Sequence, residues 1–335
     1  MIDLLKPKET MNIGSSLKFC LLAEGIADIY PRNTPTMEWD TAAGHSILKN
    51  AGGKVLSENG MELNYNKAEF KNKNFVAFGK TNNTAPSYLF SKEILSNHIK
   101  YNREIDYAVK SLKNNKLVCF PTETVYGLGA IGNNKKAINS IYLAKNRPKD
   151  NPLIAHLKNE KDAKKLVKFT NLAKKLSNQF WPGPLTMVLE INEKNELART
   201  LSQGQKTLAI RVPSHPVALD LLEKLNIPIL APSANKSGHV SPTNAKHVRD
   251  DFGKNLKNKD WEIASILDYG TTEIGLESTV VDCRGENPTI LREGFISKEI
   301  IENLLKSKIT SLKKNTQLLS PGMLSKHYSP KTKLL

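Results

Sequence analysis

Two cations follow a glycine-bearing loop near the middle of the chain. The loop runs from Pro121 to Gly129 and carries a small polar cluster, and Lys145 and Arg147 come after it. Fixed positive charge and free backbone N–H groups both favour an anion, so the arrangement predicts a phosphate site. The two cations also fall at the end of a predicted helix, where they favour the helix dipole. An isolated K-x-R is equally typical of a surface ion-pair cluster, so the spacing alone leaves both interpretations open.

A strand further along the chain carries a second candidate site. Residues 207–213 alternate, which places Thr207, Ala209 and Arg211 on one face of the predicted strand. Thr207 and Arg211 can therefore face the same cavity. The planar fork of an arginine binds both oxygens of a carboxylate, so Arg211 suits an acidic ligand, although an edge-strand salt bridge accounts for it as well.

Short apolar runs that end in polar loops must position these side chains. Leu117–Phe120 precedes the central loop, and an apolar run at 227–231 breaks into Pro232-Ser-Ala-Asn235, a donor-rich turn. Strands alternate with helices from about residue 104 to 306. This alternation predicts an α/β domain with a mixed twisted sheet.

The last part of that region predicts two paired strands and a helix. Residues 276–283 and 289–294 are apolar runs separated by a short polar segment, so we expect them to pair. Ser297 precedes a helical pattern and is expected to cap that helix.

The length and charge of the chain suggest two domains with different partners. A chain of 335 residues is long enough for two cores. Of the formal net charge of +16, residues 1–95 carry 11 Lys and Arg against 10 Asp and Glu, so +15 falls on the residues that follow. An acidic partner such as nucleotide phosphates or RNA would suit this excess, and so would a lysine-rich solvated surface.

Cysteine usage and hydropathy indicate the cellular compartment of the protein. The three cysteines, Cys20, Cys119 and Cys283, are far apart and form no C-x-x-C pair, which favours buried free thiols over a zinc ribbon or a redox pair. No stretch is long and apolar enough to span a membrane, and the N-terminus lacks the pattern of a signal peptide. We therefore expect a cytoplasmic protein without a membrane partner.

Composition also suggests where the chain divides. Residues 81–103 are polar and mixed, which is typical of a boundary. We predict an N-terminal region at 1–95, an α/β domain at 96–306 and a linker or lid segment at 307–335. In the first region, small residues follow Trp39 and Asp40 and suit a closely packed helix, where Asp40 can act as a cap or as a metal ligand.

The N-terminal region resembles part of a phosphatase. Gly14–Cys20, Ala23-Glu-Gly25 and Glu38–His45 are similar to the C-terminal part of a 3'(2'),5'-bisphosphate nucleotidase of the inositol monophosphatase superfamily, over residues 12–80. The resemblance implies a partial α/β fragment in which Asp40 is one metal ligand. The family's other ligands lie in segments that this sequence does not contain, so we expect a remnant without phosphatase activity.

Residues 104–330 resemble the YrdC-type threonylcarbamoyl-AMP synthases. The resemblance implies a mixed twisted sheet with flanking helices around a basic cavity. Its ending resembles the longer type of synthase, whose HYSP segment covers the site before a second domain; we expect that domain to be missing here. The matching segments, in the family's order, are Pro121–Leu128, Lys145-x-Arg147, Asn151-Pro-Leu153, Leu208–Pro213, Ala231–Asn235, Glu277-Ser-Thr279, Leu291–Gly294 and His327–Pro330.

The resemblance implies an ATP-dependent transferase. L-threonine and bicarbonate would give N-carboxy-threonine, which attacks ATP to yield threonylcarbamoyl-AMP and diphosphate for t6A formation in tRNA. Mg²⁺ is expected with ATP, and the machinery that transfers the threonylcarbamoyl group is the expected downstream partner. An RNA-binding module without synthase activity is the alternative, because a basic cavity could take double-stranded RNA or tRNA.

The resemblance also implies a role for individual residues. Lys145 and Arg147 would neutralise charge on the phosphates during the reaction, Arg211 would bind the threonine carboxylate, and Tyr328 would belong to a lid. The expected threonine contacts are Thr124, His156, Arg211, Ala231 and Ser278. The expected ATP contacts are Arg147, Asn151, Thr207, Ser233, Asn235, Ser241, Arg292 and Tyr328.

Overall fold

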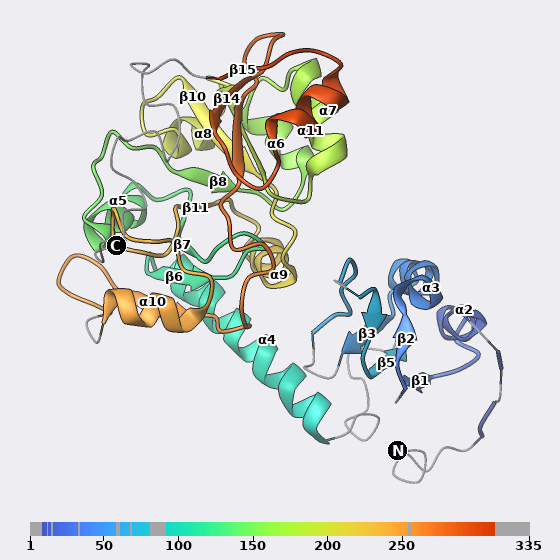
Figure 1. Ribbon diagram of the computed structural model, residues 1–335. Coiled ribbons are helices and arrows are strands. Elements are labelled where there is room, and N and C mark those ends of the chain that lie inside the picture. The colour runs from blue at the N-terminus through green and yellow to red at the C-terminus, as the bar shows by residue number, and fades with distance from the viewer. Residues whose placement is uncertain are drawn as a thin grey trace, which may run out of the picture. The chain divides into compact units, whose positions relative to one another are not determined.

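The chain divides into two compact units, residues 1–104 and 105–335 (Figure 1). The structure is a computed structural model, and it describes residues 9–11, 13–14, 16–32, 34–57, 61–67, 69–80, 92–253 and 256–311. The division between the two units falls within helix α4 (Lys92–Lys113). This helix runs across the boundary that composition suggested between residues 95 and 96.

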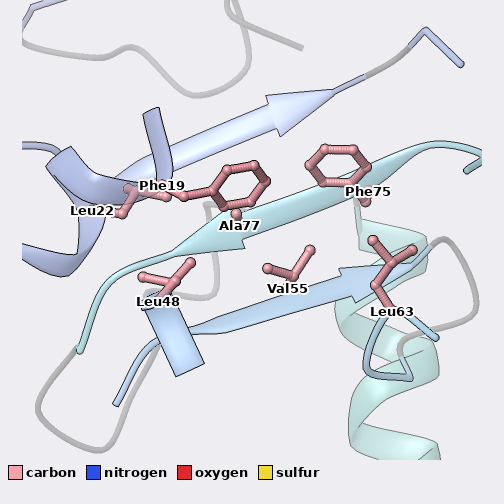
Figure 2. Close-up of a cluster of buried hydrophobic side chains, with 7 residues drawn as sticks. All are labelled: Phe19, Leu22, Leu48, Val55, Leu63, Phe75 and Ala77. Atoms are coloured by element: carbon pink, nitrogen blue, oxygen red, sulfur yellow. The ribbon is translucent and has the colours of Figure 1, made fainter. Parts of the chain in front are cut away.

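The described part of the N-terminal unit contains a three-stranded antiparallel sheet, the helices α2 and α3, and the first part of α4. Its strands pair in the order β1-β5-β3, and β2 pairs with β4 in a separate ribbon. Because side chains alternate along a strand, Phe75 and Ala77 of β5 face the same side and join Val55 of β3 in one apolar cluster. Figure 2 shows this cluster with Phe19 and Leu22 of α2 packed against it. The elements are α2 (Leu17–Ala23), β1 (Ile29–Arg32), β2 (Thr36–Met37), α3 (Glu38–Asn50), β3 (Lys54–Ser57), β4 (Lys71–Asn72) and β5 (Phe75–Phe78).

The start of α3 decides between the two interpretations of Asp40. The Asp40 carboxylate accepts a hydrogen bond from the backbone N–H of Met37 at 2.9 Å, so it caps the helix start. Within the described residues no group of three or more His, Cys, Asp or Glu side chains could hold a metal ion. The geometry therefore supports the capping role.

The C-terminal unit is built on a ten-stranded mixed sheet, as the alternating pattern predicted. The strand order is β12-β6-β7-β11-β8-β10-β9-β13-β14-β15, with β8 and β10 parallel at its centre. Strand β13 pairs with β14, which confirms the pairing expected for 276–283 and 289–294. The strands are β6 (Leu117–Phe120), β7 (Gly127–Ile131), β8 (Ile154–His156), β9 (Leu185–Glu190), β10 (Thr207–Arg211), β11 (Ile229–Ala231), β12 (Ile263–Ile266), β13 (Thr279–Asp282), β14 (Thr289–Arg292) and β15 (Thr310–Ser311).

Helices flank this sheet, and polar residues define their ends. Helix α5 packs against β6 and β7, and α7 packs against β9 (Figure 1). Asn134 caps α5 and Thr170 caps α7 through side-chain oxygens, and Ser297 caps α11 as predicted. The helices are α5 (Lys135–Lys145), α6 (Glu160–Leu166), α7 (Asn171–Phe180), α8 (Glu196–Leu201), α9 (Pro216–Leu225), α10 (Ala245–Phe252) and α11 (Lys298–Leu305).

The segment predicted as a linker begins with regular structure. Strand β15 lies at residues 310–311 and pairs in parallel with β14. The Lys, Ser and Thr residues of this segment predict only a linker. A strand of two residues is too short to show an alternating apolar pattern in the sequence. No described helix is long and apolar enough to cross a bilayer.

Gly294 follows β14 at a point where the chain passes very close to residues 277–279. A Cβ at this position would lie 2.5 Å from the backbone nitrogen of Thr279 and 2.6 Å from the carbonyl carbon of Ser278. Backbone atoms cannot rotate away, so any side chain here would push the two segments apart.

We expect Gly294→Ala to lower the free energy of unfolding by about 1–3 kcal/mol, as overpacking does. Urea denaturation monitored by circular dichroism measures the change. Gly285→Ala is the matched control, because nothing lies within 4 Å of a Cβ at that turn. Equal stability of the two variants would contradict the close approach.

Candidate active site

Three neighbouring strands place the first site residues. Arg211 of β10 lies beside His156 of β8, and Ala231 of β11 lies beside Ile154 of β8. Because side chains two apart on a strand share a face, Ile154 and His156 face the same side of the sheet. The register therefore collects residues from three separate segments on one surface.

The loop after β6 is shaped by its own threonines. The Thr122 hydroxyl donates to the Val125 carbonyl and accepts from the backbone N–H groups of Thr124 and Val125. These bonds form a side-chain-stabilised turn that is typical of Thr at such a position. The Thr124 hydroxyl is fixed in turn, 2.9 Å from that of Thr122. The turn holds the Glu123 and Thr124 side chains in defined directions.

Backbone hydrogen bonds bring two distant loops to this turn. The N–H of Ala234 donates to the Tyr126 carbonyl and the N–H of Leu128 donates to Pro232, which brings Ser233 beside Gly127. The N–H of Gly275 donates to the Thr124 carbonyl. These bonds bring the loops around 233 and 277 to one place.

The result is one pocket that most of the predicted site residues line. It is open to solvent. Thr124, His156, Arg211, Ala231 and Ser278, the expected threonine contacts, all line it, together with Arg147, Ser233 and Arg292 from the expected ATP contacts. The other lining residues are Thr122, Val125, Gly127, Ile154, Pro232 and Glu277.

Arg211 is held firmly in this pocket. Its guanidinium donates to the Gly183 carbonyl at 3.2 Å, to the Thr124 hydroxyl at 2.9 Å and to the Glu123 carboxylate at 2.6 Å. These three bonds use one N–H on each nitrogen. One N–H on each terminal nitrogen is left over, which matches the two oxygens of a carboxylate.

The Arg211–Glu123 ion pair is buried on both sides, with about 4 % of each side chain exposed. Burial raises the pKa of Glu123, but the charge of Arg211 and its hydrogen bond outweigh burial, so the net pKa is lowered. Glu123 is therefore ionised at neutral pH.

Arg147 and Arg292 are also largely buried. Arg147 donates to the side-chain and backbone oxygens of Asn151 and to the Pro152 carbonyl. Arg292 donates to the carbonyl and hydroxyl of Ser278 and forms a 2.5 Å ion pair with Glu277. Burial lowers the pKa of Arg147 to about 10, so it stays charged at neutral pH. The pocket thus has three fixed cations.

Lys145 lies behind the pocket wall instead of lining it. It is 1 % exposed, and its ammonium group donates to the carbonyls of Ser233 and Asn235. Burial, followed by the charge of Arg147, lowers the pKa of Lys145 to about 7. Its contacts hold the 233–235 loop, and so does Asn235, whose amide donates to the carbonyls of Lys236 and His239. The contacts of Lys145 and Asn235 in the structure are thus with the carbonyls of the 233–239 segment.

The remaining expected ATP contacts lie around the pocket. Asn151 is buried behind Arg147, and Ser241 donates to Glu277 at 2.7 Å. Thr207 lines a neighbouring pocket. It shares a face with Arg211 as predicted and lies four positions before it on the strand, about 13 Å away, so the two side chains line different pockets. Tyr328 lies outside the described residues.

Three buried polar residues of the site were not predicted. Glu123 pairs with Arg211, Glu277 pairs with Arg292, and the Thr186 hydroxyl lies 2.8 Å from that of Ser278. Glu123 and Glu277 lie within the quoted motifs, next to Thr124 and Ser278, and that adjacency was the available signal. Thr186 had none, because it lies in an ordinary apolar strand.

The family of the chain follows from a comparison with known proteins. The model of the Sua5/YciO/YrdC family, described as telomere recombination, matches residues 110–294, more than half of the chain. The chain belongs to this family. The Sua5/YciO/YrdC match covers every described residue that lines the pocket.

Relatives with assigned names cover the same region. The threonylcarbamoyl-AMP synthase of Bacillus subtilis is 44 % identical over 235 residues, covering 68 % of this chain and 64 % of the relative. The threonylcarbamoyl-AMP synthase of Pyrococcus abyssi is 42 % identical over 238 residues, covering 69 % of this chain and 67 % of the relative. The crystal structure of P. abyssi Sua5 complexed with L-threonine has a TM-score of 0.62 at 41 % identity and covers 68 % of this chain and 66 % of that one. The chain thus spans about two thirds of the length of these relatives.

Both ends of the chain match further families. Residues 3–89 match the inositol monophosphatase family, in agreement with the resemblance of residues 12–80. Residues 296–335 match the C-terminal domain of threonylcarbamoyl-AMP synthase. This match takes in α11 and the segment predicted as a linker or lid, so the expectation that the second domain is missing is wrong for residues 296–335.

His156 is the pocket residue whose protonation state is most strongly constrained. Burial and the charge of Arg211 lower its pKa to about 3, and its Nδ1 lies 3.2 Å from the Ile154 carbonyl. The imidazole is therefore neutral, and a proton on Nδ1 fits the carbonyl that this nitrogen faces. The unfolded chain has a histidine pKa of about 6.5 and binds the proton more tightly. Stability from this residue is therefore complete above pH 6.5 and falls as pH decreases.

We expect nitrogen-15 NMR at pH 5 to show His156 as a neutral ring protonated at Nδ1. The His156→Gln variant identifies the signal and loses less stability than the wild type between pH 6.5 and 4. A doubly protonated His156 at pH 5 would contradict the burial of this side chain.

Proposed function

We propose that the chain synthesises threonylcarbamoyl-AMP from L-threonine, bicarbonate and ATP. The observation that carries this proposal is that Arg147, Arg211, Ser233 and Arg292, from four separate segments, line one pocket. The names of the relatives support it, and it is a proposal because the chain spans only about two thirds of their length.

Threonine would bind at the end of the pocket formed by β8 and β10. The two remaining N–H groups of Arg211 suit its carboxylate, and Thr124, His156, Ala231 and Ser278 surround the same space. A neutral His156 beside Arg211 can hydrogen-bond to a hydroxyl or an amine without adding charge. The pocket thus has partners for a small polar amino acid.

ATP would bind toward Arg147 and Arg292. Two buried guanidiniums separated from bulk water attract phosphates strongly. The amide nitrogen of Asn151 is buried and has no hydrogen-bond partner within the described residues. An orphaned donor beside Arg147 fits a phosphate oxygen as its missing acceptor. Lys145 would act from behind by holding the Ser233 loop.

The chemistry needs no nucleophilic side chain. Threonine and bicarbonate form N-carboxy-threonine with loss of water, and one oxygen of its new carboxylate attacks the α-phosphorus of ATP. The bond from that phosphorus to the bridging oxygen breaks, and diphosphate leaves with the electron pair. The protein would supply orientation and fixed positive charge, which are the main sources of rate in phosphoryl chemistry.

Magnesium would enter with ATP. Within the described residues no cluster of three or more His, Cys, Asp or Glu side chains could hold a metal ion, and Glu277 is already paired with Arg292. Mg²⁺ is commonly held by substrate phosphates and water with few protein ligands, so this side-chain set fits Mg²⁺ as a component of the substrate.

The product would donate the threonylcarbamoyl group for tRNA modification. A mixed anhydride of a carbamate and AMP is a reactive acyl donor, so the downstream partner would be the machinery that transfers the group to tRNA as t6A, in the cytoplasm. The double-stranded RNA alternative is less well supported, because a duplex needs exposed cations for its phosphates. Here Arg147 and Arg211 are only 7 % and 3 % exposed.

The N-terminal unit would not contribute phosphatase activity. Asp40 caps α3, and no multi-carboxylate group lies within the described residues of this unit. Magnesium-dependent phosphate hydrolysis needs several oxygen ligands around the ion.

Release of diphosphate is the direct test of the proposed function. We expect release from ATP only when threonine and bicarbonate are both present, together with a product of the mass of threonylcarbamoyl-AMP. Incubation with adenosine 3',5'-bisphosphate serves as the control for the N-terminal unit and should give no phosphate. Diphosphate release that persists without threonine would overturn the proposal.

Removal of the Arg211 side chain should weaken the binding of threonine more than the binding of ATP. We expect Arg211→Ala to weaken threonine binding about 10- to 100-fold and ATP binding less than about threefold, because a charge-assisted pair to the amino acid is lost. Titration calorimetry with each substrate measures both constants. Arg199→Ala, an exposed arginine of α8, is the control. Equal losses for both substrates would refute the assignment of Arg211.

A further inference from the structure

Two buried glutamates lie beside the arginines of the pocket. Side-chain exposure is 4 % for Glu123 and 12 % for Glu277. A carboxylate repels an anion, and desolvation makes that repulsion stronger than in water. A pocket that only had to attract a carboxylate and a triphosphate would be better without them, so their presence calls for another role.

Glu123 has contacts on both of its oxygens. Oε1 accepts from Nη2 of Arg211 at 2.6 Å, and Oε2 accepts from the backbone N–H of Ser214 at 3.0 Å. Thr124, the next residue, accepts from Nη1 of the same arginine. Together with the Gly183 carbonyl, these contacts leave the guanidinium a single orientation.

Glu277 has a matching arrangement around Arg292. Oε2 pairs with Nη1 of Arg292 at 2.5 Å, and Oε1 accepts from the Ser241 hydroxyl at 2.7 Å. Arg292 uses its other nitrogens on Ser278. Glu277 therefore joins an arginine of β14 to the loop that carries Ser241.

We propose that Glu123 and Glu277 are positioning residues, each of which orients one arginine for one substrate. Glu123 sets Arg211 for the carboxylate of the amino acid, and Glu277 sets Arg292 and Ser241 for the phosphates of the nucleotide. Each arginine keeps its remaining N–H groups for the ligand. This assignment rests on the proposed function and adds which group prepares each half of the pocket.

The two glutamates differ in a way that makes the proposal testable. Their contacts reach different arginines and different segments, Ser214 in one case and Ser241 in the other. Loss of one glutamate should therefore affect one substrate. Simple repulsion predicts the opposite sign, because removal of a negative charge would then tighten the binding of the threonine carboxylate and of the ATP phosphates.

The experiment measures threonine and ATP binding to Glu123→Gln and Glu277→Gln by titration calorimetry. We expect Glu123→Gln to weaken threonine binding about 10-fold or more and ATP binding less than about threefold. Glu277→Gln should weaken ATP binding about 10-fold or more and threonine binding less than about threefold. L-threoninol, which lacks the carboxylate, should bind the wild type and Glu123→Gln alike, because Glu123 acts only through the carboxylate site.

Controls separate positioning from stability. Glu190→Gln removes an exposed carboxylate paired with Lys168 and should change neither constant. Circular dichroism and thermal melts monitor folding. If a glutamine variant does not fold, Glu123→Asp or Glu277→Asp keeps the charge but withdraws it by one methylene, and should give the same selective loss.

The experiment distinguishes failure of the positioning roles from failure of the proposed function. A wild-type protein that binds neither threonine nor ATP contradicts the function itself. A wild type that binds both, with variants that lose both substrates equally or bind them more tightly, overturns the positioning roles. Selective loss in each variant supports them.

Discussion

Three largely buried guanidinium groups constrain the structure of the C-terminal unit around its pocket. Burial of a charged group costs several kcal/mol unless partners replace its hydration. Arg147, Arg211 and Arg292 each have such partners, made of backbone carbonyls, hydroxyls, an amide and two carboxylates. Much of the polar structure around the pocket exists to satisfy these donors. The same partners fix the direction of the N–H groups that remain.

This requirement explains why the site is assembled from loops that cross-link one another. The 121–126 turn, the 232–235 loop and the 274–278 segment are joined by backbone hydrogen bonds. Lys145 anchors one of these loops from behind, and Gly294 lets the chain pass against another. A rigid frame lowers the cost of orienting two substrates, because little conformational entropy is left to lose on binding.

The two units differ in what they retain of the families they match. The C-terminal unit has a pocket whose walls come from both the centre and the later strands of its sheet. The N-terminal unit has a packed apolar cluster and a capped helix at its motif, without a group of metal ligands in its described residues (Figure 2). An apolar core can persist where catalytic ligands do not, since packing needs only volume and hydrophobicity.

Local chemistry made part of this protein predictable from its sequence alone. The alternation of strands and helices, the cap at Ser297, the pairing of β13 with β14 and the motifs of the pocket all depend on neighbouring residues or short periods. Tertiary structure decided the rest. Thr207 and Arg211 share a face yet line different pockets, Lys145 donates to carbonyls instead of lining the pocket, and Glu123 pairs with an arginine far along the chain. These outcomes depend on distances between segments, which no local pattern encodes.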